Sequence, residues 1–357
     1  MSQLLQSCDP VRTVTAGAGW SNATQAQAVP LSFNELVRQS PRRLAMPIAV
    51  YPGLALTGAT VRDVVTQPRA QVEAQAALHE RYRTPFLLSA MDLSVEAEAF
   101  GCGLHLSDNE IPAVTGRLVT NLEQARNLAV PRPGDKRTAV YLEAVRQLSR
   151  RYADNMVLAG CIGPFSLAAR LIGVSEALEL TLTEPELIQA VLEPSAEFLT
   201  QYIRAFQAAG ADGIIMAEPA AGLLSPRGLA AFSSAYIRQI AAAAAKPGFT
   251  IILHNCAAKL LHLAAIQETG LKTFHFGAPM DIVAALDKVP PEAVLCGNLD
   301  PTGMFVQQSP GEIVSRTRGL LSATERFPNF VISSGCDVPS AAPLASLDAF
   351  FRSVAGN

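Results

Sequence analysis

The chain has 357 residues, of which 49% are hydrophobic and 17% charged, and its formal net charge is -3. This composition is typical of a globular protein with a large core and excludes a disordered chain. Because 28 basic residues are balanced by 31 acidic ones, there is no basic excess for binding a nucleic acid. We therefore expect a small molecule or another protein as the binding partner.

The first 28 residues are rich in Ser, Gln, Ala and Thr, and we expect residues 1–28 to form an N-terminal arm outside a single domain at 29–357. They lack the basic segment followed by an apolar one that marks a signal peptide. No apolar stretch approaches the roughly 18 to 20 residues of a membrane-spanning helix, so we expect a cytoplasmic protein without membrane contact. In that reducing compartment the six cysteines are expected to be buried thiols, metal ligands or a nucleophile rather than disulfides.

Eight short apolar runs follow along the chain, each bounded by Gly or Pro and most followed by a helix-like stretch. They are MPIAVYP (46–52), PFLLSAMD (85–92), MVLAGCIG (156–163), DGIIMAEP (212–219), FTIILHNC (249–256), LKTFHFG (271–277), AVLCGNLDP (293–301) and FVISSGC (330–336). Eight parallel strands with intervening helices are what a closed (β/α)8 barrel requires. The alternative is an open doubly wound sheet, but the chain has neither Gly-x-Gly-x-x-Gly before a helix nor a phosphate-binding Gly-x-x-x-x-Gly-Lys-Ser/Thr. The predicted fold is therefore a single TIM barrel of the α/β class.

Two long segments between these runs, at 183–210 and 225–248, have the amphipathic pattern of helices. The second begins with Ser225-Pro226 and ends at Lys246-Pro247-Gly248, which is typical helix punctuation. The interval from 93 to 155 is too long for one crossover between strands. We therefore expect extra helices inserted between the second and third strands of the barrel.

Side chains able to bind a metal or hold a proton lie at the ends of the runs, where the carboxyl ends of the strands are expected. They are Tyr51, Asp92, Cys161, Glu218, His254, Cys256, His275, Asp300 and Cys336. In a barrel such residues converge on one face although they lie far apart in the sequence.

His254 and Cys256 are two residues apart, so in an extended segment both side chains point the same way and can meet one ion. Cys336 ends the eighth run and could complete the set. One imidazole and two thiolates suit zinc, and three protein ligands leave the fourth position open, as in catalytic sites. The sequence thus predicts zinc held by His254, Cys256 and Cys336. Taken alone, each residue is equally compatible with a small buried cysteine or a hydrogen-bonded structural histidine.

Two acidic residues at the same face are candidates for catalytic roles. Glu218, which ends the fourth run, could be a weaker ligand that holds the open position until substrate displaces it. Asp300 could orient substrate or support a ligand, although Asp-Pro is equally typical of a turn or a helix cap. Cys102 and Cys296 are expected to be structural. Cys161 could be structural or functional, with packing favoured, and His262 is expected to be a packing or a surface residue. His275 stays undecided.

Several motifs together resemble the uroporphyrinogen decarboxylase superfamily. They are His-x-Cys at the fifth run, the late SSGCDVP, MDLSVEAEAFG (91–101), GPFSLAARLIG (163–173), AGADGIIMAEPAAGLLSP (209–226) and GNLDP (297–301). Within the superfamily, His-x-Cys with the late Cys resembles the zinc-dependent methylcobamide:coenzyme M methyltransferases. The resemblance runs from about residue 30 to the end of the chain.

This resemblance implies a (β/α)8 barrel in which His254, Cys256 and Cys336 hold zinc, with Glu218 in the acidic position after the fourth strand. It also implies a methyltransferase that moves a methyl group from a methylated corrinoid to a zinc-bound thiol such as coenzyme M. The methyl donor would be methylcobalamin or, in the cell, a corrinoid protein that binds at the barrel mouth.

Two other functions stay open. One is the decarboxylase itself, but that branch resembles this chain poorly near the first strand, where it carries Arg-Gln-Ala-Gly-Arg. Here the segment reads VYPGLALTGATVRD, with no arginine between Arg43 and Arg62 to hold the carboxylates of a porphyrinogen. The other is a non-catalytic subunit that binds zinc within a corrinoid complex. The sequence leaves open which thiol accepts the methyl group, since homocysteine is an alternative, and whether the chain forms a homo-oligomer.

Overall fold

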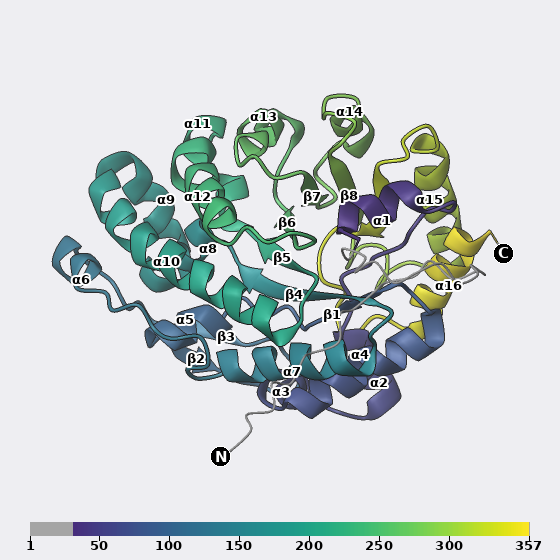
Figure 1. The fold of residues 1–357 in the computed structure, drawn as a ribbon, viewed down its shortest axis with the longest axis horizontal. Coiled ribbons are helices and arrows are strands. Elements are labelled where there is room, and N and C mark those ends of the chain that lie inside the picture. Colours follow the sequence, from purple (N-terminus) through teal and green to yellow (C-terminus); the bar gives the residue numbers. More distant parts are fainter. Residues whose placement is uncertain (1–30, 357) are drawn as a thin grey trace, which may run out of the picture.

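The computed structural model describes residues 31–356, and its centre is one curled sheet of seven parallel strands (Figure 1). In spatial order the strands are β1 (Phe86–Leu88), β4 (Met156–Ile162), β5 (Gly213–Ala217), β6 (Thr250–Asn255), β7 (Thr273–Phe276), β8 (Val294–Leu299) and β9 (Phe330–Ser334). Nearly all of their residues are buried, as in a parallel sheet that is covered on both faces. The prediction of an α/β, TIM-barrel-like fold is confirmed.

The first predicted run, 46–52, is the exception among the eight, because it forms no strand. The residue before it, Ala45, forms one parallel bridge with Ile332 of β9. The run itself then leads into the 3-10 helix η1 (Tyr51–Gly53). The ladder stops because the Ile48 N–H donates to the side-chain hydroxyl of Ser334 (2.9 Å) instead of a backbone carbonyl. The prediction of eight strands is therefore wrong in this one position, which holds a bridging segment beside β9.

The interval between β1 and β4 contains the extra helices that its length predicts. They are α5 (Val95–Phe100), α6 (Leu122–Arg126) and α7 (Thr138–Arg151). The interval also contains a feature that the sequence did not indicate, an antiparallel hairpin of β2 (Gly103–His105) and β3 (Ala113–Thr115).

The two long predicted helices differ in outcome. The segment 183–210 forms α10 (Pro185–Ala209), as predicted, and its last turn ends at the left-handed Gly210. The segment 225–248 is divided into α11 (Pro226–Leu229), the π-helical turn η3 (Ala230–Ser234) and α12 (Ala235–Ala243).

The remaining helices surround the sheet, with α9 and α10 on one side of the view and α15 and α16 on the other (Figure 1). They are α1 (Phe33–Gln39), α2 (Leu54–Thr57), α3 (Val61–Thr66), α4 (Pro68–Tyr82), α8 (Pro164–Ile172), α9 (Val174–Thr183), η2 (Ala220–Leu223), η4 (Leu260–His262), α13 (Leu263–Gln267), α14 (Ile282–Leu286), α15 (Pro310–Ala323) and α16 (Leu344–Ala355). Within the described residues, no helix combines the length and the apolar character needed to cross a bilayer. The predicted arm at 1–28 lies outside the described residues.

Candidate metal centre

Three metal-capable side chains meet at the carboxyl ends of β6 and β9. His254 is the penultimate residue of β6, Cys256 follows that strand directly, and Cys336 comes two residues after β9. One ligand atom from each residue lies within 4.8 Å of the other two. His254 is buried, whereas the two cysteines are partly exposed, so solvent reaches the group from the side of the cysteines. The structure thus brings together the three residues that the sequence predicts as zinc ligands.

Two glycines allow the loops of this group to approach each other closely. A Cβ atom on Gly277, after β7, would lie 2.2 Å from the carbonyl oxygen of Cys256. A Cβ atom on Gly335 would lie 2.9 Å from the backbone nitrogen of Ala278. Because real Cβ atoms do not pack at such distances, any side chain at Gly277 would push the Cys256 loop away from its neighbours.

The two ring nitrogens of His254 have different surroundings. Nδ1 lies 2.8 Å from Nδ1 of His275, which is the residue paired with His254 in the parallel register of β6 and β7. Nε2 is buried and has no hydrogen-bond partner among the described residues. A buried nitrogen without a partner is costly, since it has lost its hydrogen bonds to water. On a side chain that has a ring nitrogen within 4.8 Å of the ligand atoms of Cys256 and Cys336, such a nitrogen fits a metal ligand.

The two cysteines are coupled through a hydrogen bond between their sulfur atoms. This bond from Cys336 lowers the pKa of Cys256 to about 7. The same bond, together with burial, raises the pKa of Cys336 to about 12. Without a metal the pair therefore favours one thiolate and one thiol. An imidazole and two thiolates within reach of one another are ligands that suit zinc.

His275 belongs to the centre, although the sequence left it undecided. Its Nε2 lies 2.8 Å from the hydroxyl oxygen of Ser333, and its side chain is fully buried. Burial, and then the neighbouring His254, hold the pKa of His275 well below the ordinary value, so the ring is neutral. The available signal was the pair of histidines at the ends of successive runs, but only the strand register places them side by side.

Glu218 follows β5, the strand beside β6, and its carboxylate is held by the start of α8. One oxygen accepts the Phe165 N–H and the other accepts the Ser166 N–H, both at 2.8 Å. The Ser233 hydroxyl in η3 donates a third hydrogen bond at 2.9 Å. Burial raises the pKa of Glu218, although these hydrogen bonds act in the opposite direction. Glu218 lies outside the group of three, and its role as a weaker ligand remains a prediction.

Asp300 is exposed and closes the turn after β8. Its side chain accepts the backbone N–H groups of Thr302 (3.0 Å) and Gly303 (2.9 Å). These contacts are those of the turn that Asp-Pro predicts. A catalytic role for Asp300 remains a prediction.

His262, expected to lie in the packing or at the surface, and the remaining described cysteines are all buried. His262 is buried and bonds to the backbone at both ring nitrogens, with the Lys259 N–H at 3.0 Å and the Leu224 carbonyl at 3.1 Å. Three cysteines are buried with free thiols: Cys102, Cys161 and Cys296.

A family model for uroporphyrinogen decarboxylase (URO-D) matches residues 42–356 of the chain. The chain belongs to the URO-D family. A methylcobamide:CoM methyltransferase MtbA from Methanosarcina acetivorans is 29% identical over 272 residues, which cover 75% of this chain and 77% of that protein. A uroporphyrinogen decarboxylase from Psychromonas ingrahamii is 27% identical over 294 residues, 78% of each chain. Among solved structures, a methyltransferase from Methanosarcina mazei has a TM-score of 0.80 at 21% identity, covering 90% of this chain and 96% of its own, which shows a shared fold.

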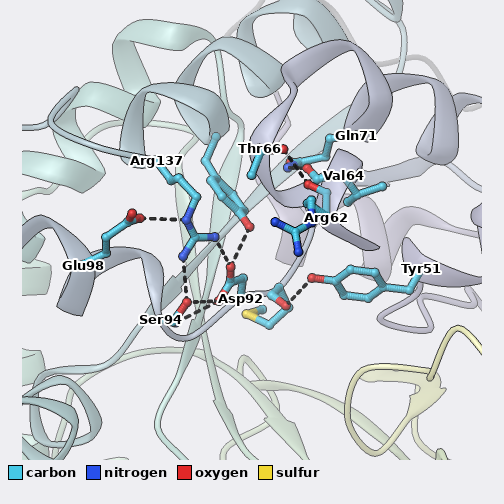
Figure 2. Close-up of polar contacts among 11 residues, drawn as sticks. Tyr51, Arg62, Val64, Thr66, Gln71, Asp92, Ser94, Glu98 and Arg137 are labelled. Atoms are coloured by element: carbon cyan, nitrogen blue, oxygen red, sulfur yellow. Dashed lines mark hydrogen bonds and ion pairs between the residues drawn. The ribbon is translucent and has the colours of Figure 1, made fainter. Parts of the chain in front are cut away.

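A second polar cluster lies after β1 in this URO-D family barrel, and its side chains bond to one another (Figure 2). Each nitrogen of the buried Arg137 guanidinium donates to a side chain: Nη1 to Asp92, Nε to Glu98 (2.7 Å) and Nη2 to the hydroxyl of Ser94 (2.8 Å). Asp92 also accepts the Tyr141 hydroxyl (3.3 Å). Burial lowers the pKa of Arg137, but the charges of Asp92 and the groups around it raise it more, so the guanidinium stays charged. In this cluster, the ion network, each nitrogen of the guanidinium thus has a partner within the protein.

Proposed function

We propose that this chain is a zinc-dependent methyltransferase that moves a methyl group from a methylated corrinoid to a thiol such as coenzyme M. The observation that carries the proposal is the group of His254, Cys256 and Cys336, which has one ligand atom from each residue within 4.8 Å of the others, together with a buried Nε2 of His254 that has no hydrogen-bond partner among the described residues. The names of family members support the reaction class, because they include methylcobamide:CoM methyltransferase and methylated-thiol–coenzyme M methyltransferase.

The residues of the centre fit zinc and would bind it through His254, Cys256 and Cys336. Zinc at this position would supply a Lewis acid that favours the thiolate form of a substrate thiol near neutral pH, where a free thiol is mostly protonated. Cys256 and Cys336, as thiolates, would offset the charge of the ion, and the substrate sulfur would then stay nucleophilic. Any thiol proton on Cys256 or Cys336 would have to leave for both sulfurs to become ligands.

The methyl group would be taken from cobalt by the substrate sulfur. A sulfur–carbon bond forms as the cobalt–carbon bond breaks, and the electron pair of that bond stays on the corrinoid as Co(I). The thiol proton leaves to solvent. What the protein contributes is binding, orientation and deprotonation of the thiol. We expect the methyl donor to be presented at the barrel mouth by a corrinoid protein, and free methylcobalamin to replace it in a test tube.

Decarboxylation of a porphyrinogen is the alternative, because the family also includes uroporphyrinogen decarboxylases. The substrate of that reaction carries many carboxylates, which need arginine partners. The sequence has no arginine between Arg43 and Arg62, and the buried Arg137 gives all three nitrogens to Asp92, Glu98 and Ser94. These observations favour methyl transfer.

One experiment separates the two activities. We expect purified protein to contain about one zinc ion per chain. It should convert methylcobalamin to Co(I), followed by absorbance, only when a thiol is added, and a panel of coenzyme M, homocysteine and simple thiols would identify the acceptor. Removal of zinc by a chelator should abolish the reaction, and its return should restore it. Full activity on a porphyrinogen after zinc removal would overturn the proposal.

A further inference from the structure

We infer that His275 is a positioning residue that accepts a hydrogen bond from Nδ1–H of His254 and so holds the Nε2 lone pair of His254 toward the two cysteines. The inference rests on the proposed zinc site, and it concerns how this chain prepares that site before the ion arrives. Three residues act in sequence: Ser333, His275 and His254.

The direction of these hydrogen bonds is set by the backbone carbonyl of Met46, which can only accept a hydrogen bond. The carbonyl oxygen of Met46 lies 2.5 Å from the hydroxyl oxygen of Ser333, so the single hydroxyl proton of Ser333 is donated to that carbonyl. The Ser333 oxygen must then accept from Nε2 of His275, at 2.8 Å. His275 therefore carries its proton on Nε2, which leaves a lone pair on its Nδ1.

The same reasoning gives the tautomer of His254, the proposed zinc ligand. The two Nδ1 atoms of His254 and His275 lie 2.8 Å apart, and a hydrogen bond between them needs one donor and one acceptor. Because Nδ1 of His275 is the acceptor, Nδ1 of His254 is the donor. A neutral His254 with its proton on Nδ1 has a bare Nε2, which is the buried nitrogen without a partner. The three hydrogen bonds thus account for an Nε2 that carries no proton.

The fold fixes this order of contacts by bringing four chain segments together. His254 and His275 are register partners on β6 and β7, while Ser333 lies on β9 and Met46 lies in the segment that bridges to β9. The side chains of His275 and Ser333 are fully buried and His254 is 2% exposed, so no water competes for the ring nitrogens. The rings meet at 75° with centroids 4.7 Å apart. The segment that bridges to β9 therefore also sets the tautomer of the proposed ligand.

Nitrogen NMR of the zinc-free protein tests the hydrogen-bond directions without any activity. Histidine labelled with 15N would be examined under a chelator and a reductant, and spectra of His254→Ala and His275→Phe would assign the two rings. We expect His254 to be protonated on Nδ1 and His275 on Nε2. A His254 protonated on Nε2, or a doubly protonated His275, would overturn the inference.

Zinc affinity tests the consequence for the ion. His275→Phe keeps the ring but removes the acceptor, and it should weaken zinc binding about 10- to 100-fold in competition with a chelator. His275→Asn offers an oxygen near the position of Nδ1 and should bind zinc within about tenfold of the wild type and more tightly than His275→Phe. His79→Phe, which removes a buried histidine on α4 outside the group, is the matched control and should leave zinc affinity unchanged.

The outcomes separate this inference from the proposed function. If the wild-type protein binds no zinc, the proposed function fails, while the NMR result still decides the hydrogen-bond directions. If the wild type binds zinc and both His275 variants bind it equally well, the inference fails and the proposed function stands. Thermal unfolding of the zinc-free proteins distinguishes a purely structural effect, which would lower stability in His275→Phe without changing zinc affinity.

Discussion

The metal centre and the ion network lie after strands of the same barrel, yet they differ in how completely their polar atoms are paired. In the ion network, each nitrogen of Arg137 donates to a neighbouring side chain (Figure 2). In the metal centre, the buried Nε2 of His254 has no hydrogen-bond partner in the part of the chain that the structure describes. Folding normally pairs buried polar groups, and an unpaired nitrogen in a side chain that lies within reach of two thiols is suited to a ligand. The charged cluster is the structural one, and the less charged cluster is the candidate active site.

The largest expected effect is loss of the ion from the metal centre. Cys336→Ser or His254→Ala should lower zinc content from about one ion per chain to near zero, because two ligands cannot hold zinc as three do. Metal analysis of the purified variants measures this, and methyl transfer should fall with it. Cys102→Ser, which changes a buried thiol outside the group of three, should keep its zinc. Full zinc content in Cys336→Ser would remove that residue from the ligand set.

The ion network should respond in stability rather than in zinc content. Arg137→Met leaves the buried Asp92 without its counter-ion, and the free energy of unfolding should fall by about 3–5 kcal/mol. Denaturant unfolding measures the change. The control is Arg126→Met, because Arg126 and its partner Glu186 are both more than half exposed, and this change should cost about 1 kcal/mol or less. A loss of zinc in folded Arg137→Met protein would break the distinction between the two regions.

Glu96 lies on α5 beside the ion network and should make stability depend on pH. Burial raises its pKa to about 8, so the folded protein keeps this proton at pH values where the unfolded chain releases it. The contribution of Glu96 to stability should therefore fall by about 1.4 kcal/mol per pH unit as pH rises from 5 to 8. Glu96→Gln should lack this part of the slope. Denaturant unfolding at several pH values compares the two proteins, and parallel slopes would show that Glu96 is charged in the fold.

A substitution of Glu218 tests whether this carboxylate beside β6 serves the metal centre or only the start of α8. Glu218→Gln places an amide nitrogen against an N–H group of α8 and should cost about 1–3 kcal/mol of stability. Because its observed contacts are to α8 and Ser233, we expect zinc affinity to stay close to that of the wild type. A clear drop in zinc affinity, measured by chelator competition, would instead support the predicted ligand role.

The smallest stability effect is expected at Asp300. Asp300→Asn keeps a side-chain oxygen for the N–H groups of Thr302 and Gly303, so the free energy of unfolding should change by about 0.5 kcal/mol or less. Methyl transfer measured on the same sample then tests the predicted catalytic role. An unchanged rate would confine Asp300 to the turn.

Much of the fold was predictable because strands and helices leave local patterns. Seven of the eight apolar runs are strands, and the helix predicted at 183–210 is α10. The two differences from the prediction have separate causes. Near Met46 the strand ladder stops because a backbone N–H donates to the side-chain hydroxyl of Ser334. The predicted helix at 225–248 is interrupted by the π-helical turn that carries Ser233.

The sequence by itself determined the residue types of the candidate metal centre and their place at strand ends. His254 and Cys256 could be paired from their spacing, and Cys336 from its position at the end of the last run. The tertiary structure alone decided which other groups surround them. It placed His275 beside His254, and it directed Glu218 to α8 and Arg137 to Asp92. The physical reason is that periodicity and chain order fix local structure, whereas hydrogen-bond partners between segments depend on strand register and on how the barrel closes.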